Sequence, residues 1–333
     1  MGKRTKNLGR FQRDWSRQVG LTLFIIAVSV AVDIRNPRFF SVVNLSDMIS
    51  NTAILSILAI GMMIVIITAG IDLSIASTMA LSGMVTALTV QANRGLSPML
   101  ALLIGLAVGV LCGGVISVFV VRFSVAPIIA TLGFMNAYRG LTYLVSHSNW
   151  VGPGQMSNGF MMIARGKILG INNLVIIAML LYLLAFYFLN YTRFGRQIYA
   201  VGSNAESAKV SGINTNHVLF TVYVIMGAFA GLAGVLWVSK FASAQGDTAL
   251  GYEMNVIAAC VLGGVSLRGG SGKLSGVLLG SLLLGILNDA LPLIDVSPFW
   301  QSAIQGAIIL VAVISNVFFK RRVEYKTLAR RNI

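Results

Sequence analysis

Charged side chains are scarce in this 333-residue chain: only 11% of the residues are Asp, Glu, Lys or Arg, whereas 56% are hydrophobic. A soluble domain has roughly 25% charged residues, so the composition excludes an ordinary soluble globule and a disordered chain. Acidic residues are the scarcest, with 10 Asp and Glu against 25 Lys and Arg. The net charge of +15 therefore reflects missing acids, and the high apolar content argues against a nucleic-acid-binding domain.

Cysteine and histidine are nearly absent, with two residues of each kind. Cys112 and Cys260 lie inside apolar runs, which is typical of small buried side chains and argues against a disulfide or a Cys-based metal site. We expect His147 and His217 near span ends on opposite sides of a membrane, too far apart to share a metal. The glycine-rich stretch 269–274 ends in leucine where a phosphate-binding loop needs Ser or Thr. We therefore expect no enzymatic activity, no metal and no cofactor.

What the chain does contain is a series of ten apolar stretches, most of them close to the about 20 residues that a helix needs to cross the hydrocarbon core. Glycine is frequent, with 35 residues, as expected where membrane helices pack closely. We predict an all-α, polytopic membrane protein that forms one transmembrane domain over residues 1–333. The predicted spans are 19–34, 51–69, 73–92, 98–121, 125–145, 172–190, 217–240, 252–267, 274–290 and 298–319.

The distribution of basic residues predicts the orientation. With ten spans, 18 of the 25 Lys and Arg residues fall on one side, including the basic arm 1–18 and the tail 320–333, and six fall on the other. Arg139 lies within a span. The positive-inside rule then places both termini in the cytoplasm of a cell with the chain in its inner membrane. Alternatively, Val19–Val32 is part of a cleavable signal peptide, which would leave nine spans and an outside N-terminus.

Polar residues in or near the spans are candidates for a transport path, because they are costly in lipid. The segment Gly70–Ser74 lies between the second and third predicted spans. Gly70 can end one helix and Asp72 can cap the next, or the segment forms a broken-helix site beside the path. Amide side chains deeper in the spans can bind substrate hydroxyl groups, and can equally hold helices together. The predicted path residues are Gly70, Asp72, Ser74, Asn136, Asn255 and Asn288.

The long segment 191–217 is predicted to be a cytoplasmic loop. Its stretch Asn204–Gly212 predicts a short helix that Asn204 caps and Gly212 ends, with a small-residue face at Ala205 and Ala208. Such a helix is too short to be stable alone, so we expect it to dock on a partner; the alternative is a solvated connector. The predicted interaction residues are Arg193, Arg196, Asn204, Glu206, Ala208 and Gly212.

Four motifs spread over about two-thirds of the chain carry a family resemblance. They are GIDLS at 70–74, TLGFMNAYRG at 131–140, TRFGRQIYAVG with NAESAKVSGI at 192–213, and AACVLGGVSLRGG at 258–270. With these motifs in this order, the chain resembles the permease subunit of ribose-type ABC importers, a group that also handles arabinose, rhamnose and autoinducer-2. The chain departs from the family pattern GIDLSVGS at Ala76, where the family has glycine.

The resemblance implies a channel of two permeases, identical or homologous, that imports a monosaccharide. It implies ATP-binding cassette subunits docked inside on a coupling helix within 191–217, a periplasmic sugar-binding protein outside, and no nucleic acid. Autoinducer-2 or another small polyol is an alternative substrate. A secondary transporter is an alternative from another class, but it would need intramembrane ionisable residues, of which this chain has few.

Overall fold

The computed structural model describes residues 2–297, 299–301, 303–304, 306–307 and 310, with side chains from residue 18 onward, so the predicted span 298–319 falls mostly outside the described residues. Within them the chain is almost entirely helical. The helices are α1 (Gly2–Arg35), α2 (Val42–Ile67), α3 (Ile75–Ala92), α4 (Pro98–Val121), α5 (Pro127–Ser146), α6 (Asn158–Arg165), α7 (Asn173–Tyr191), α8 (Arg193–Ser203), α9 (Ala205–Val210), α10 (Thr215–Phe241), α11 (Tyr252–Leu262) and α12 (Leu274–Leu293). A 3-10 turn (Pro153–Gln155) and a hairpin of β1 (Lys167–Ile168) and β2 (Ile171–Asn172) complete the described part.

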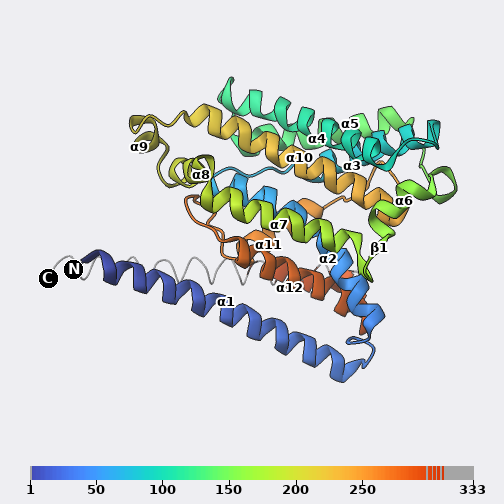
Figure 1. The fold of residues 1–333 in the computed structure, drawn as a ribbon, viewed down its shortest axis with the longest axis horizontal. Coiled ribbons are helices and arrows are strands. Elements are labelled where there is room, and N and C mark those ends of the chain that lie inside the picture. The colour runs from blue at the N-terminus through green and yellow to red at the C-terminus, as the bar shows by residue number, and fades with distance from the viewer. Residues whose placement is uncertain (1, 298, 302, 305, 308–309, 311–333) are drawn as a thin grey trace.

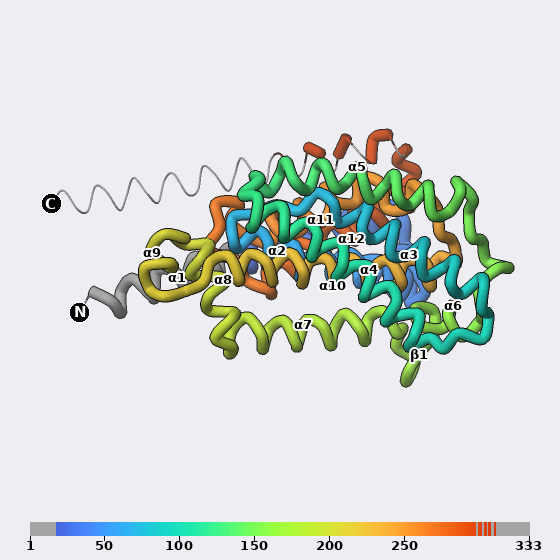
Figure 2. The backbone as a smooth tube through the Cα atoms, turned by 90° about the horizontal axis from the view of Figure 1, so that it is seen from above, coloured from blue at the N-terminus to red at the C-terminus, as the bar shows by residue number. Residues whose placement is uncertain are grey.

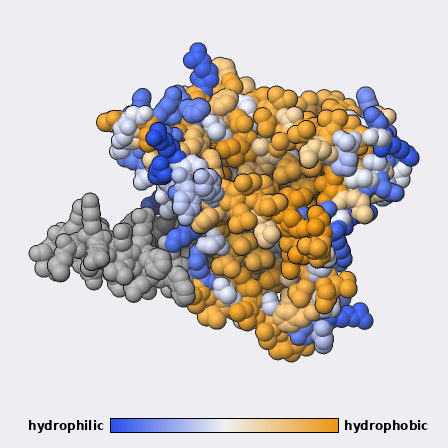
Figure 3. All heavy atoms as spheres, viewed as in Figure 1, coloured by the Kyte–Doolittle hydropathy of each residue, from blue (hydrophilic) through white to orange (hydrophobic). Residues whose placement is uncertain are grey.

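The long helices run along a common axis and form one bundle (Figures 1 and 2). The short helices α8 and α9 lie at one end of the bundle, whereas α6 and the β hairpin lie at the other. Helices α5 and α7 cover opposite sides (Figure 2). Hydrophilic residues gather at the two ends and hydrophobic residues form a belt between them (Figure 3), which is the surface expected of a protein that spans a bilayer.

The predicted spans agree with the helices wherever the chain is described. Among the described residues, seven helices are long and apolar enough to cross a membrane: α1, α2, α3, α4, α7, α10 and α12. Helix α5 has the required length, with 20 residues, but a more polar composition. Helix α11 is apolar but has only 11 residues. All nine predicted spans before residue 298 therefore coincide with helices, although two of their boundaries were wrong.

The two wrong boundaries have local causes. Helix α2 begins at Val42 rather than at residue 51, because the Ser41 side chain accepts a hydrogen bond from the backbone N–H of Asn44 (3.3 Å) and caps an earlier start. Helix α11 ends at Leu262 rather than at residue 267, because Gly264 adopts a left-handed conformation (φ +94°) and opens the turn 263–273.

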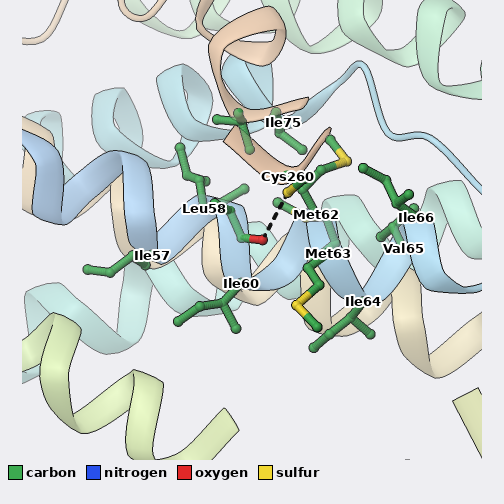
Figure 4. Close-up of a cluster of buried hydrophobic side chains, with 14 of the residues drawn as sticks. Ile57, Leu58, Ile60, Met62, Met63, Ile64, Val65, Ile66, Ile75 and Cys260 are labelled. Carbon is green, nitrogen blue, oxygen red and sulfur yellow. Dashed lines mark hydrogen bonds between the residues drawn. The ribbon is translucent and has the colours of Figure 1, made fainter. Parts of the chain in front are cut away.

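Helix α2 forms the centre of the bundle. All its residues from Thr52 to Ile67 are buried, and α7, α10, α11 and α12 pack around it. A helix that is buried on all sides is expected to be apolar all round, which explains why its apolar residues show no single face. Around α2, the thiol of Cys260 on α11 contacts the carbonyl of Ala59 at 3.4 Å (Figure 4). Both cysteines are free and buried, as predicted.

Helices α4 and α10 make the most extensive contact in the described bundle, and glycine makes it possible. A Cβ atom on Gly109 would overlap the carbonyl of Gly227, and a Cβ on Gly231 would overlap the carbonyl of Gly105. Without side chains at these positions the two backbones touch, which maximises van der Waals contact where lipid offers no hydrophobic drive for association. Gly105 and Gly109, four residues apart on one face of α4, both serve this packing.

Candidate functional site

The first candidate region is the break between α2 and α3, which spans residues 68–74. The α2 helix ends at Ile67, and the chain turns through Ala69, whose φ of +63° lies in the left-handed region. The prediction that Gly70 ends the helix was therefore wrong by one residue. Gly70 serves another purpose: a Cβ on it would lie 2.5 Å from the hydroxyl oxygen of Tyr223 on α10. Only glycine lets this tyrosine pack against the break.

Asp72 and Ser74 stabilise the break from within. Asp72 is 2% exposed and Ser74 is fully buried. One carboxylate oxygen of Asp72 accepts the backbone N–H of Ser74 (2.9 Å) and the Ser74 hydroxyl (2.6 Å). The N–H of Ser74 is thereby satisfied just before α3, which begins at Ile75. The N-cap of α3 is Ser74, which has no side-chain cap hydrogen bond, so Asp72 stabilises the turn before the helix and does not cap the helix as expected.

The surroundings of Asp72 contain further polar groups from other helices. The Thr131 hydroxyl on α5 lies 3.3 Å from the carbonyl of Ile71. The Tyr223 side chain is fully buried, and its hydroxyl has no hydrogen-bond partner among the described residues. A buried hydroxyl without a partner costs free energy. The break therefore contains both a hydrogen-bonded carboxylate and a hydroxyl without a partner among the described residues.

The second region is the exposed face of α5. Asn136 is exposed, and its amide donates to the carbonyl of Leu132 on its own helix (3.1 Å). The guanidinium of Arg139, one turn away, donates to the carbonyls of Gly246 and Thr248 (2.8 Å each). Arg139 thus attaches α5 to the loop 242–251 between α10 and α11.

The third region is a cavity of about 250 Å³ in the half of the bundle away from α8 and α9. Asn288 lines it, as do residues that the sequence did not single out; Asn255, which lies on α11 one turn after Tyr252, does not. The cavity combines aromatic, aliphatic, amide and carboxylate side chains. Its lining consists of Asn51, Thr52, Ile54, Leu55, Trp237, Phe241, Tyr252, Gly285, Asn288 and Asp289.

A polar network surrounds this cavity. The ammonium group of Lys240 on α10 donates to the side-chain oxygen of Asn51 on α2. The Asn44 amide donates to the carboxylate of Asp289 on α12 (2.8 Å). Asn51 and Lys240 lie at the ends of predicted spans, so the sequence alone indicates only that they mark span boundaries. Only the tertiary contact between α2 and α10 brings them together, so the sequence offered no signal for this pair.

The six predicted path residues therefore do not form one site. Gly70, Asp72 and Ser74 form the break, Asn136 lies on the outer surface of α5, and Asn288 lines the cavity. Asn255 is half-buried on α11. The side chains of Asn136 and Asn288 are both exposed, so a ligand or another chain can reach them.

The fourth region is the connector 191–217, which contains two helices, α8 and α9, where one had been predicted. The predicted helix is α9. Asn204 caps it, because its side chain accepts the backbone N–H of Ser207 (2.8 Å), and Gly212 follows it with φ +81°. Arg193, Arg196 and Glu206 are exposed, as an interaction surface requires.

Ala208 differs from the expectation. Its side chain is 4% exposed and belongs to the core of the chain itself, whereas Ala205 is exposed. The two alanines therefore do not form a common face for a partner. Ala208 is buried because α9 folds back onto the bundle, and the backbone N–H of Ile213 donates to its carbonyl (3.0 Å). The exposed surface of α9 is formed by other residues, among them Val210.

Comparison with known proteins identifies a family. The family model described as "Branched-chain amino acid transport system / permease component" matches residues 44–313. The chain is 38% identical to the ribose import permease protein of Escherichia coli (strain K12) over 306 residues, which cover 91% of this chain and 95% of the relative.

Two further relatives have other substrates in their names. The L-arabinose ABC transporter permease protein of Azospirillum brasilense is 32% identical over 299 residues, covering 89% of this chain and 86% of the relative. The galactose/methyl galactoside import permease protein of Escherichia coli (strain K12) is 33% identical over 314 residues, covering 89% of this chain and 93% of the relative. No solved structure matches the chain.

The hydrogen bonds between Asp72 and Ser74 generate a stability prediction. We expect Asp72→Ala to lower the free energy of unfolding by about 1–3 kcal/mol, the usual cost of leaving a buried hydrogen-bonding group without its partner. Asp72→Asn keeps a side-chain oxygen that can accept the Ser74 N–H and should lose less. Thermal unfolding of the purified protein in detergent measures both. If Asp72→Ala unfolds at the wild-type temperature, the carboxylate does not stabilise the break.

Proposed function

The chain belongs to the family of transport-system permease components, and from this membership we propose that it is the membrane subunit of an ABC importer for a monosaccharide. A permease component is a membrane transport subunit and not an enzyme. The observation that carries the proposal is the pair of short helices α8 and α9 at one end of an apolar bundle. They present exposed charged residues to a partner, while the chain carries no recognisable ATP-binding motif of its own.

The proposed substrate is a neutral, hydroxyl-rich molecule. Support comes from the relatives named above, whose names specify ribose, L-arabinose and galactose. The family title names branched-chain amino acids, but a zwitterion needs charged partners of both signs. The exposed polar groups at Asn136 and Asn288 are neutral amides, which donate to and accept from hydroxyls. Autoinducer-2 or another small polyol would satisfy the same amides and is the alternative substrate.

The proposed orientation places α8, α9 and both termini in the cytoplasm. The connector carries three basic residues against one acid, and most basic residues of the described part of the chain fall on its side of the bundle when the helices are followed in order. We expect reporter fusions after residue 160 to be active outside and those after residue 205 inside. An outside signal at residue 205 would reverse the orientation.

The proposed partners follow from the two ends of the bundle. An ATP-binding cassette subunit docks on the exposed surface of α8 and α9, which includes Arg193, Arg196 and Glu206, as well as Val210, whose side chain is 89% exposed. Asn204 and Gly212 shape the two ends of α9 for this contact. A periplasmic sugar-binding protein docks at the opposite end.

A second permease copy, identical or homologous, is proposed to pack on α5. Gly133 and Gly140 lie on this helix, and a Cβ added to either would meet nothing within 4 Å; Asn136 is exposed between them. Glycines at an open surface allow another helix to approach closely, and an exposed amide inside a membrane is stabilised by a partner across the contact. The sugar would pass between the two copies, where Asn136 lines the route.

The central test is ATP-driven uptake. In vesicles that contain the permease, its ATP-binding subunit and its binding protein, we expect labelled ribose, arabinose or galactose to accumulate only when ATP is present inside. A parallel preparation without the ATP-binding subunit should show no accumulation. Uptake by the permease alone, driven by a proton or sodium gradient, would favour a secondary transporter instead.

The arrangement of two copies is tested by cross-linking. Asn136→Cys should yield a disulfide-linked dimer on mild oxidation, because two Cys on facing helices can reach bonding distance. The native cysteines give little background, since both are buried. The matched control is Asn190→Cys on α7, which covers the opposite side of the bundle (Figure 2). Dimers from Asn190→Cys but not from Asn136→Cys would place the interface on the other side.

A further inference from the structure

We propose that Tyr199 on α8 is a positioning residue that couples the connector to the break between α2 and α3, through an inner junction made by Ile67, Gly202, Gly270 and Gly272. This inference rests on the proposed function, because it assigns a route by which motion at α8 reaches the membrane helices. The junction joins three segments that are far apart in sequence: the end of α2, helix α8 and the turn 263–273 between α11 and α12.

The carbonyl of Ile67 is the centre of the junction. The last carbonyls of a helix lack partners within it, so something else must satisfy them. The next residues of the chain do not use this carbonyl: the N–H groups of Thr68 and Gly70 donate to Val65, and that of Ala69 donates to Ile66. Ile67 instead accepts the backbone N–H of Gly270 at 2.8 Å. The end of α2 is thus bound by the turn 263–273.

Helix α8 lies against the same atoms. A Cβ on Gly202 would overlap the carbonyl oxygen of Ile67 and lie 2.9 Å from the nitrogen of Gly270. On the other side of the contact, a Cβ on Gly270 would lie 2.8 Å from the α-carbon of Ser203, and Gly270 itself has φ +71°. Three backbones therefore meet with no side chain between them, so a displacement of one cannot be absorbed by a rotamer change.

Tyr199 makes the side-chain hydrogen bond that holds α8 to the turn. Its hydroxyl donates to the carbonyl of Gly272 at 3.0 Å. Tyr199 precedes Gly202 by three residues and so lies on the same face of α8. Burial raises the pKa of the Tyr199 hydroxyl, which keeps it protonated and able to donate at neutral pH. Helix α8 thus contacts the turn at both Gly270 and Gly272.

The junction connects directly to the break. Asp72 follows Ile67 by five residues, and the residues between them, 68–71, lie outside both α2 and α3. Helix α9 directly follows α8 in the chain, and we propose that its exposed surface binds the ATP-binding subunit. A shift of α8 therefore displaces the turn and the end of α2 together, and the break, with its unsatisfied Tyr223 hydroxyl, is the element that can adopt a second arrangement.

The test measures how many sugar molecules are transported per ATP hydrolysed by the complete reconstituted transporter. Tyr199→Phe keeps the ring but removes the donor, and we expect this ratio to fall about fivefold or more while the rate of ATP hydrolysis stays near wild type. Tyr187→Phe, at an exposed tyrosine of α7, is the matched control and should leave the ratio unchanged. A wild-type ratio in Tyr199→Phe would overturn the proposal.

Hydrogen exchange tests the junction without the ATP-binding subunit. In the purified permease, Tyr199→Phe should increase amide exchange in residues 263–273 and 66–74 but not in α4. Gly202→Ala should do so more strongly, whereas Gly114→Ala, where a Cβ has nothing within 4 Å, should not. If Gly202→Ala fails to fold, the exchange rates of Tyr199→Phe alone test the junction. If Tyr199→Phe exchanges faster but the wild-type protein transports sugar without ATP, the junction is supported and the proposed function is wrong. If exchange in Tyr199→Phe equals that of the wild type, the junction is wrong.

Discussion

The hydrocarbon core of a membrane contains no water to satisfy backbone N–H and C=O groups, and this constraint governs every interruption of the bundle. At the break between α2 and α3, a carboxylate of the chain itself accepts the N–H of Ser74. At the end of α2, a glycine N–H from a distant turn satisfies the carbonyl of Ile67. Protein groups therefore satisfy both interruptions, a neighbouring side chain in the first case and a distant segment in the second.

Glycine allows the backbones of different segments to approach each other closely. The contact of α4 with α10 and the contact of α8 with α2 both place backbone against backbone. In the first case many glycines share a long contact between two helices, which makes a rigid pair. In the second, Gly202 brings a surface helix to the end of a core helix. The same residue type thus produces a stable core in one place and a mechanical link in another.

Much of the architecture could be predicted because spans depend on local composition. Apolar length located the helices, and the capping side chain of Asn204 located α9, since both signals are contained in a few neighbouring residues. The structural roles of Gly70 and Ala208 could not be predicted from neighbouring residues in the sequence. Gly70 is required by Tyr223, which lies over 150 positions along the chain, and Ala208 is buried by folding of the connector onto the bundle. The pairing of Lys240 with Asn51 likewise exists only in the folded state.

The shortness of α11 has a consequence for the membrane around it. With 11 residues, the helix rises about 17 Å, little more than half of a hydrocarbon layer of about 30 Å. The remaining depth must be crossed by the non-helical segments on either side, 242–251 and 263–273. Such segments are stable at membrane depth only when protein buries them or water reaches them. Most residues of α11 are buried against neighbouring helices, so the segment depends on protein contacts and not on lipid for its stability at that depth.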